Sequence, residues 1–381
     1  AQTTGSGYNV ALGYNAMTAN TSGTENTAAG WNALGANTTG SYNIAFGGGA
    51  LDANTTASNN SAVGFGALST NSTGTSNTAV GYKALNLNAT NDNNTAVGYN
   101  ALENNVADSN TGVGYSALGA NTTGANNVAV GVNSLDANTT ASNNVAVGRN
   151  ALLVNTTGAS NVAVGTYALD ANTTASNNTA VGYQAGTLLT TGEENTLIGY
   201  QSGDALSTGG NNVAVGRGSL TAATTGDHTV AIGSLALQSV TTAEGNVAIG
   251  RLALQDNTAA NNTAVGYDVL KENTTGASNT AVGAYALDAN TTGSSLVAIG
   301  KGALGANTTA NDNTAVGDSA MLANTTGTQN VAVGKSALLV NTTGTYNTAV
   351  GVLALDANTT ANLRLRSTAQ AETTLLLVTQ L

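Results

Sequence analysis

Aliphatic positions recur at a fixed period along this chain, and that period is the strongest signal in the sequence. A segment of the form Asn-(Thr/Val)-Ala-(Val/Ile)-Gly returns every 17 residues, for example at Gly131, Gly148 and Gly165. Twenty-one copies run from Gly13 to Gly351, and only two of the spacings shorten to 16 residues. A near-constant internal period indicates a repeat architecture rather than a series of separate globular domains.

Each copy predicts short strands joined by turns. With the repeat glycine as position 0, a copy carries Asn at −4, an aliphatic residue at −1, Ala-Leu at +3 and +4, and Asn-Thr-Thr-Gly/Ala at +7 to +10. A β-branched run bounded by Gly and Asn predicts a strand, and the Ala-Leu segment predicts a second strand after a turn at the glycine. We therefore expect two strands per coil, with positions −1 and +4 in the core. Dense Gly, Asn and Thr disfavour a helix.

Stacked in register, these copies predict an all-β parallel β-solenoid, or β-roll, of about 21 coils over residues 1–362. Coils spaced by about 4.8 Å would give a rod of roughly 100 Å. The absence of Pro fits a ladder that needs every N–H, Gly supplies positive φ at the corners, and stacked Asn side chains can hydrogen-bond along the axis. Because so slender a stack buries little apolar surface, we expect it to assemble into an oligomeric fibre.

Composition narrows the possible functions. The 381 residues include no Cys, one His, and 9 basic against 20 acidic residues, and the net charge of −11 argues against nucleic acid as a partner. The hydrophobic share of 41% argues against disorder. No apolar run reaches the roughly 20 residues that span a bilayer. Acidic residues at +5, such as Asp52 and Asp136, have no base or nucleophile at matched spacing. We therefore expect no enzyme activity, no metal site and no cofactor.

The repeat resembles a known family. Asn-Val-Ala-Val-Gly-x-x-Ala, from Asn144 through Gly148 to Ala151, is similar to the repeat of YadA-like head domains in trimeric autotransporter adhesins, and similar repeats occur in phage tail fibres. The likeness covers about Asn9 to Asn362. It implies left-handed parallel β-rolls that pack as trimers, project from bacterial surfaces and bind host or matrix ligands. The period here is longer than that of the family, and the extra residues fall in the Asn-Thr-Thr-Gly turn.

These observations predict an extracellular structural and adhesive fibre that mediates surface attachment. Its expected partners are copies of itself, as a homotrimer or a head-to-tail homopolymer, together with surface glycans or matrix proteins. The expected location is extracellular, on a cell surface or on a virion tail. Two alternatives remain open: a homopolymeric surface or matrix filament without a specific receptor, and a phage tail-fibre shaft.

Position +1, directly after the repeat glycine, is a candidate ligand-binding row. Arg or Lys occupies it in five copies, so it is expected to face outward. Its aromatic residues would form a stacking ladder for glycans or a partner chain, or alternatively only cover a corner and keep the fibre soluble. They are Tyr14, Trp31, Phe65, Tyr82, Tyr99, Tyr115, Tyr183, Tyr200 and Tyr267.

A second candidate lies between residues 182 and 256, where the Asn at +7 is replaced in four consecutive copies and acidic residues gather with the single His. It would be a lateral-contact patch, or alternatively a stretch of drifted coils that pack an apolar residue where others bond an Asn. Its members are Leu189, Glu193, Glu194, Asp204, Leu206, His228 and Val240.

The turns and the C-terminal tail complete the candidates. Asn-Thr-Thr sequons make glycosylation possible at Asn37, Asn121, Asn155 and Asn324, although turn chemistry alone explains the pattern.

The tail over residues 363–381 alternates like a strand and then becomes apolar. Because the end of a solenoid exposes unpaired backbone, we expect the tail to cap the last coil or join the next subunit. Its candidate assembly residues are Leu363, Leu365, Leu375, Leu376, Leu377 and Val378.

Overall fold

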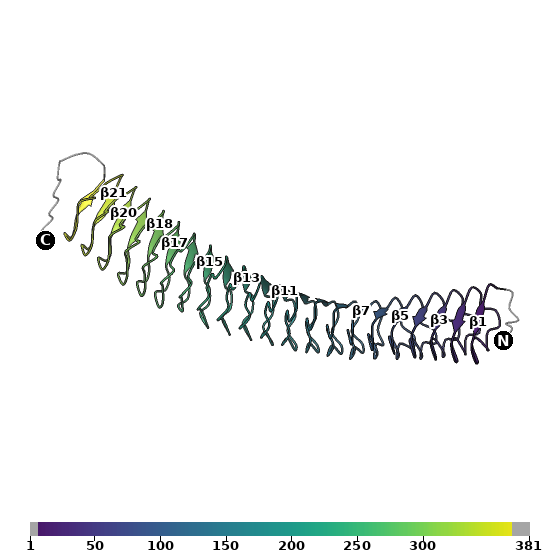
Figure 1. Ribbon diagram of the computed structural model, residues 1–381. Helices are drawn as coiled ribbons and strands as arrows, with labels where there is room; N and C mark the ends of the chain where they lie inside the picture. The colour runs from purple at the N-terminus through teal and green to yellow at the C-terminus, as the bar shows by residue number, and fades with distance from the viewer. Residues whose placement is uncertain (1–6, 368–381) are drawn as a thin grey trace. The chain divides into compact units, whose positions relative to one another are not determined.

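The computed structural model describes residues 7–367 and is all-β, with no helix among those residues (Figure 1). It is a parallel β-solenoid of about 21 coils with a 17-residue repeat. The chain divides into two compact units, Ala1–Glu194 and Asn195–Leu381. In Figure 1 the coils of the first unit run from purple to teal and those of the second from green to yellow.

The first unit contains one three-residue strand per coil, and each strand pairs in parallel with the next. The register joins identical positions, for example Ala146 with Ala163. The strands are β1 (Val10–Leu12), β2 (Thr27–Ala29), β3 (Ile44–Phe46), β4 (Ser61–Val63), β5 (Thr78–Val80), β6 (Thr95–Val97), β7 (Thr111–Val113), β8 (Val128–Val130), β9 (Val145–Val147), β10 (Val162–Val164) and β11 (Thr179–Val181).

The second unit repeats this arrangement, for example with Ala214 opposite Ala231. Its strands are β12 (Thr196–Ile198), β13 (Val213–Val215), β14 (Val230–Ile232), β15 (Val247–Ile249), β16 (Thr263–Val265), β17 (Thr280–Val282), β18 (Val297–Ile299), β19 (Thr314–Val316), β20 (Val331–Val333), β21 (Thr348–Val350) and β22 (Leu365–Arg366).

The predicted second strand of each coil is wrong, because the Ala-Leu segment forms a turn. The Leu at +4 has a left-handed backbone, with φ of 52° at Leu152. That conformation costs a residue with a Cβ about 1–2 kcal/mol, and burying a Leu side chain returns about as much or more. The turn is also tied to the next coil, since the Leu152 N–H donates to the Ala168 carbonyl at 3.1 Å.

The aliphatic residue at −1 is also not a core residue, contrary to the prediction. Side chains alternate along a strand, and the Ala at −2 points inward, so positions −3 and −1 point outward. Ala146 is fully buried, whereas Val80 at −1 keeps 37% of its surface exposed. The apolar interior is made by Ala at −2, Ala at +3 and, as predicted, Leu at +4.

The interior volume is balanced within the coil of β12. The coil of β12 carries Leu197 at −2, where nearly every other coil has Ala, and it carries Gly203 at +4 in place of Leu. A Cβ added to Gly203 would lie 2.8 Å from Leu197 Cδ2. The large residue at −2 therefore occupies the space that the Leu at +4 fills elsewhere.

Two rows of buried Asn hold consecutive coils together. At +7, Asn138 Nδ2 donates to Asn121 Oδ1 at 2.8 Å and to the Ala141 carbonyl at 3.0 Å. This confirms the predicted side-chain ladder for that row. At −4 the pattern differs, because Asn144 Oδ1 accepts from the backbone N–H of Asn161 at 2.9 Å and Asn144 Nδ2 donates to the Gly158 carbonyl. Each Asn therefore satisfies backbone groups that the turns leave unpaired.

The repeat glycine is required by both conformation and space. Gly148 has a φ of 137°, and a Cβ at that position would lie 2.6 Å from the carbonyl carbon and oxygen of Gly165 in the next coil. A side chain there would prevent the coils from approaching to the spacing of a sheet.

We predict that Asn138→Ala destabilises the first unit by about 2–4 kcal/mol, because it leaves buried donors and acceptors on both sides without partners. The groups left without a partner are Asn121 Oδ1 and one N–H of Asn155 Nδ2, which lies 3.1 Å from Asn138 Oδ1, whereas the Ala141 carbonyl keeps its bond from Asn127 Nδ2 at 2.9 Å. Chemical denaturation followed by circular dichroism measures the change. The control is Thr140→Ala on the exposed surface of the same coil, with an expected change below about 0.5 kcal/mol. Equal effects of the two variants would contradict the role of the ladder.

Candidate functional surfaces

The outward residues of β1–β21, at positions −3 and −1, form a continuous row pair in each unit, which we call the strand face. Every one of these positions is uncharged, and they are filled mainly by Val, Ile and Thr. Many of the −1 side chains are more than one third exposed, such as Val63 at 38% and Ile299 at 40%. With eleven strands in the first unit and ten, β12–β21, in the second, each unit carries a strand face about 50 Å long and about 10 Å wide, or about 500 Å².

Sequence reasoning missed the strand face because it assigned position −1 to the interior. A signal was nevertheless present in the sequence. Position −2 is Ala in all copies but two, as expected of a tightly packed interior, whereas position −1 ranges in size from Ala29 to Phe46. A position that tolerates so wide a range of volumes does not lie in a close-packed core.

Position +1 faces outward, as predicted. Its candidate aromatic residues all have exposed side chains, from 40% for Tyr82 to 72% for Tyr14. Four of them, which we call the aromatic strip, stack in consecutive coils of the first unit with nearly parallel rings. Their ring centroids are 5.8 Å apart for Phe65 and Tyr82, 5.0 Å for Tyr82 and Tyr99, and 5.3 Å for Tyr99 and Tyr115.

Stacking changes what the aromatic strip can bind. The inner rings of Tyr82 and Tyr99 have neighbours on both faces, whereas Phe65 and Tyr115 each have a stacked partner on one face only. Exposure follows the same order, with the outer rings at 57% and 53% and the inner rings at 40% and 47%. A sugar stacked on an aromatic residue needs a free ring face. The inner rings therefore offer edges only, which argues against a glycan-stacking ladder along the whole strip.

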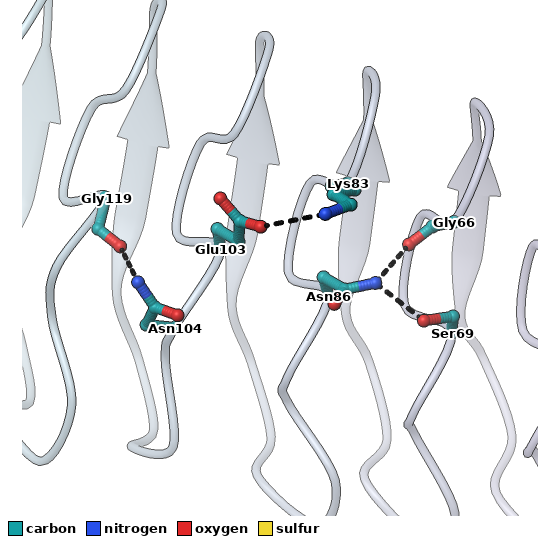
Figure 2. A network of polar contacts seen from close by, with 7 residues as sticks. All are labelled: Gly66, Ser69, Lys83, Asn86, Glu103, Asn104 and Gly119. Atoms are coloured by element: carbon teal, nitrogen blue, oxygen red, sulfur yellow. Dashed lines mark hydrogen bonds and ion pairs between the residues drawn. The ribbon is translucent and has the colours of Figure 1, made fainter.

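Polar contacts beside the aromatic strip tie the same coils together (Figure 2). Lys83 Nζ lies 3.5 Å from Glu103 Oε1 in the next coil and 5.7 Å from the centroid of the Tyr82 ring. Asn86 Nδ2 donates to Ser69 Oγ at 2.6 Å and to the Gly66 carbonyl. These contacts are only partly buried and each contributes little, but together they hold the coils that carry the stacked rings in register.

Basic residues at +1 contact aromatic residues in the following coil. Arg149 lies 5.7 Å from the Tyr167 ring centroid, and Arg251 lies 5.5 Å from that of Tyr267 and donates to its hydroxyl at 2.8 Å. Tyr267 also meets Tyr285 edge to face. Such pairs contribute about 0.5–1 kcal/mol each at exposed sites.

The predicted lateral-contact patch is wrong for its apolar members. Leu189, Leu206 and Val240 are buried, because they replace the inward Asn at +7. Among the described residues, Asn172 Oδ1 beside the first of these replacements has no hydrogen-bond partner. The charged members are distributed differently: Glu193, Glu194 and His228 are exposed and Asp204 is half-buried.

Glycosylation of the four candidate Asn residues is incompatible with the folded coil. Asn37, Asn121, Asn155 and Asn324 are fully buried. Each donates twice from Nδ2, once to the Asn of the preceding coil and once to a backbone carbonyl. A sugar attached to Nδ2 would expel the side chain from the +7 ladder.

The tail is described only in part. Leu365 pairs with Thr348 as β22 continues the parallel ladder of the second unit, and Leu363 and Leu365 are exposed. The remaining candidates, Leu375, Leu376, Leu377 and Val378, lie outside the described residues. A role of the tail in capping or assembly stays a prediction.

Chemistry-bearing groups are sparse. Among residues 7–367 no cluster of three or more His, Cys, Asp or Glu side chains could hold a metal ion. No helix in that part of the chain has the length and apolar character needed to cross a membrane.

The carboxyl groups with shifted pKa values belong to Asp at +5, where partial burial raises the pKa. They are Asp52, Asp136, Asp170, Asp204 and Asp288.

Comparison with known proteins adds no assignment. No protein-family model matches the chain, and no curated protein matches it either. A repetitive β-solenoid fits a structural, fibre-like protein, and a finer account of function has to come from the surfaces described above.

We predict that the free energy of unfolding increases as the pH is lowered from neutral to about pH 4. Burial raises the pKa of Asp136 and the other +5 carboxyls in the folded chain, so the folded state takes up protons more readily than the unfolded state as the pH falls. Loss of negative charge from a chain of net −11 acts in the same direction. Denaturant midpoints across this range measure the effect.

Two substitutions separate the effect of the partly buried +5 carboxyls from the effect of the net negative charge. Asp136→Asn should raise stability at neutral pH and reduce the gain on acidification, because the buried carboxylate is absent. Glu193→Gln removes the same charge from an exposed side chain and should leave both nearly unchanged. Stability that falls steadily on acidification above about pH 4 would contradict the prediction.

Proposed function

We propose that this protein is a structural fibre subunit that assembles laterally with copies of itself through the strand face, as part of an extracellular or surface-attached fibre. The observation that carries the proposal is the strand face itself. The strand face of each unit is about 500 Å², the size of the largest apolar patches of soluble monomers, which are often functional. The strand face of one unit alone reaches more than half of the roughly 800 Å² per partner of a stable interface.

The nature of the partner follows from the residues of the strand face. It is uncharged and its two outward positions recur once per coil, so its natural complement is a surface with the same rise per coil. A second copy of this chain has that rise at every coil. Partners of other kinds would have to match the same spacing over many coils.

The resemblance to YadA-like head repeats supports the same proposal and favours three chains per fibre. It also supports an adhesive role on a bacterial surface or, through the tail-fibre likeness, on a virion. The abundance of Asn, Thr and Gly, with 8% charged residues, suits a fibre whose stability comes from uniform inter-coil bonding rather than from ion pairs.

We predict that the wild-type chain is larger than its monomer mass of 37.2 kDa in solution. Introducing Val63→Lys, Val80→Lys and Val130→Lys together should dissociate the assembly, because each buries a charge in an apolar interface. Static light scattering measures the molar mass, and circular dichroism verifies that the solenoid is retained.

The matched control places three lysines on another surface of the same coils, as Thr73→Lys, Thr90→Lys and Thr140→Lys, where the side chains are exposed. This variant should remain assembled. A monomeric wild-type chain, or a strand-face variant of unchanged mass, would refute lateral assembly through the strand face. Electron microscopy of the same samples distinguishes discrete fibres from end-to-end polymers.

A further inference from the structure

The rarest large residues of this chain gather around one glycine-rich corner. The sequence contains one Trp and two Phe in 381 residues, and it contains a single Gly-Gly-Gly triplet, Gly47–Gly49. Trp31 at +1 precedes the triplet by one coil, Phe65 at +1 follows it by one coil, and Phe46 adjoins it on the strand face. All three aromatic side chains are more than half exposed.

The backbone does not require the second and third glycines. Gly47 is the repeat glycine, but Gly48 has no left-handed φ, and the φ of 67° at Gly49 resembles the 54° of Asn32 at the same position one coil earlier. A Cβ at Gly49 would meet nothing within 4 Å, and one at Gly48 would meet only the Phe65 ring, at 3.3 and 3.6 Å. The backbone of Gly48 and Gly49 is therefore not covered by side chains of its own coil, and the Phe65 ring lies beside Gly48.

The gap has the dimensions of one missing ring. Trp31 and Phe65 occupy +1 positions two coils apart, a rise of about 10 Å. In the aromatic strip, successive rings at +1 stack with centroids 5.0–5.8 Å apart. Two such centroid spacings equal about the distance between the +1 positions of Trp31 and Phe65. One additional flat ring above Gly48 would therefore have an aromatic ring on each side. Phe65 is stacked with Tyr82 on one face only, and its ring atoms Cδ2 and Cε2 lie 3.3 and 3.6 Å from the position of a Cβ at Gly48.

The residues around Gly48 indicate what kind of ligand could supply the additional ring. No charged residue occurs between Asn26 and Leu51, so a neutral ligand fits better than an ion. Aromatic faces carry negative potential and attract polarised C–H groups. A pyranose presents such C–H groups on its faces and keeps its hydroxyls at its rim, where this open corner leaves them hydrated.

We propose that the corner formed by Trp31, Gly48, Gly49 and Phe65 is a binding site for a neutral pyranose unit of a glycan. The sugar ring takes the place of the missing +1 side chain and stacks between the indole and the phenyl ring. This site lies beside the strand face, and its existence does not depend on lateral assembly.

Trp31 provides a direct readout, since it is the only Trp in the chain. The full-length protein is titrated with neutral oligosaccharides built from glucose, galactose, mannose or N-acetylglucosamine, and Trp emission is recorded. Binding of at least one of these sugars should change the intensity or the wavelength of the emission in a saturable way.

The variant Gly48→Tyr fills the gap with a residue that other coils carry at +1. Its Cβ would lie 3.3 Å from the Phe65 ring, which has to shift slightly, and circular dichroism verifies that the fold is retained. It should weaken sugar binding by about ten-fold or more, equal to about 1.4 kcal/mol. The matched control is Val132→Tyr, which adds a ring at +1 next to Tyr115 and leaves the corner open. This control should bind like the wild type.

Because Gly48→Tyr also alters the surroundings of Trp31, saturation-transfer NMR on the sugar provides a second readout that does not use the indole. Absence of binding by the wild type at millimolar sugar, or equal binding by Gly48→Tyr, would overturn the proposal. Binding of free indole without binding of any sugar would overturn the assignment to a pyranose. Light scattering of the same samples reports lateral assembly separately, so failure of one proposal leaves the other standing.

Discussion

In-register hydrogen bonding from each coil to the next is the constraint on which the rest of the structure depends. Strands of three residues are too short to be stable alone, and each gains its partners only because the following coil repeats the same positions. The Asn residues at −4 and +7 extend this bonding through the turns, as Asn138 and Asn144 show. The repeat glycine allows the close approach, and the period follows, because every coil must return the chain to the same register.

Much of this could be predicted from the sequence, since a period of 17 with Gly, Asn and Leu at fixed positions has few structural solutions. The all-β parallel solenoid, the glycine corners, the buried Leu at +4 and the side-chain ladder at +7 are confirmed. The prediction that −1 lies in the core is wrong: a β-branched residue is typical of a core strand, but here an Ala at −2 already fills so small an interior. The second strand was wrong because left-handed Leu residues, such as Leu152, are rare enough that sequence propensity does not indicate them.

The candidate surfaces were predictable to different degrees. The outward direction of position +1 followed from its mixture of aromatic and basic residues, whereas the stacking that closes the inner faces of Tyr82 and Tyr99 requires coordinates. The sequence predicts a contact patch at Leu189 and Val240, because it shows that they replace Asn but does not show that they are buried. The strand face and the open corner at Gly48 share one origin: a coil with an interior this small must display its larger side chains outside.

The inward direction of −2 and the outward direction of −1 support both the fold and the proposed assembly, and thiol labelling tests them most directly. The chain has no Cys, so Ala146→Cys and Val147→Cys each introduce a single thiol at neighbouring positions. In the folded monomeric chain we expect the thiol at 147, which replaces a half-buried side chain, to react with a water-soluble reagent without unfolding, while the thiol at 146 reacts only upon unfolding. Equal rates, or faster reaction at 146, would contradict this expectation.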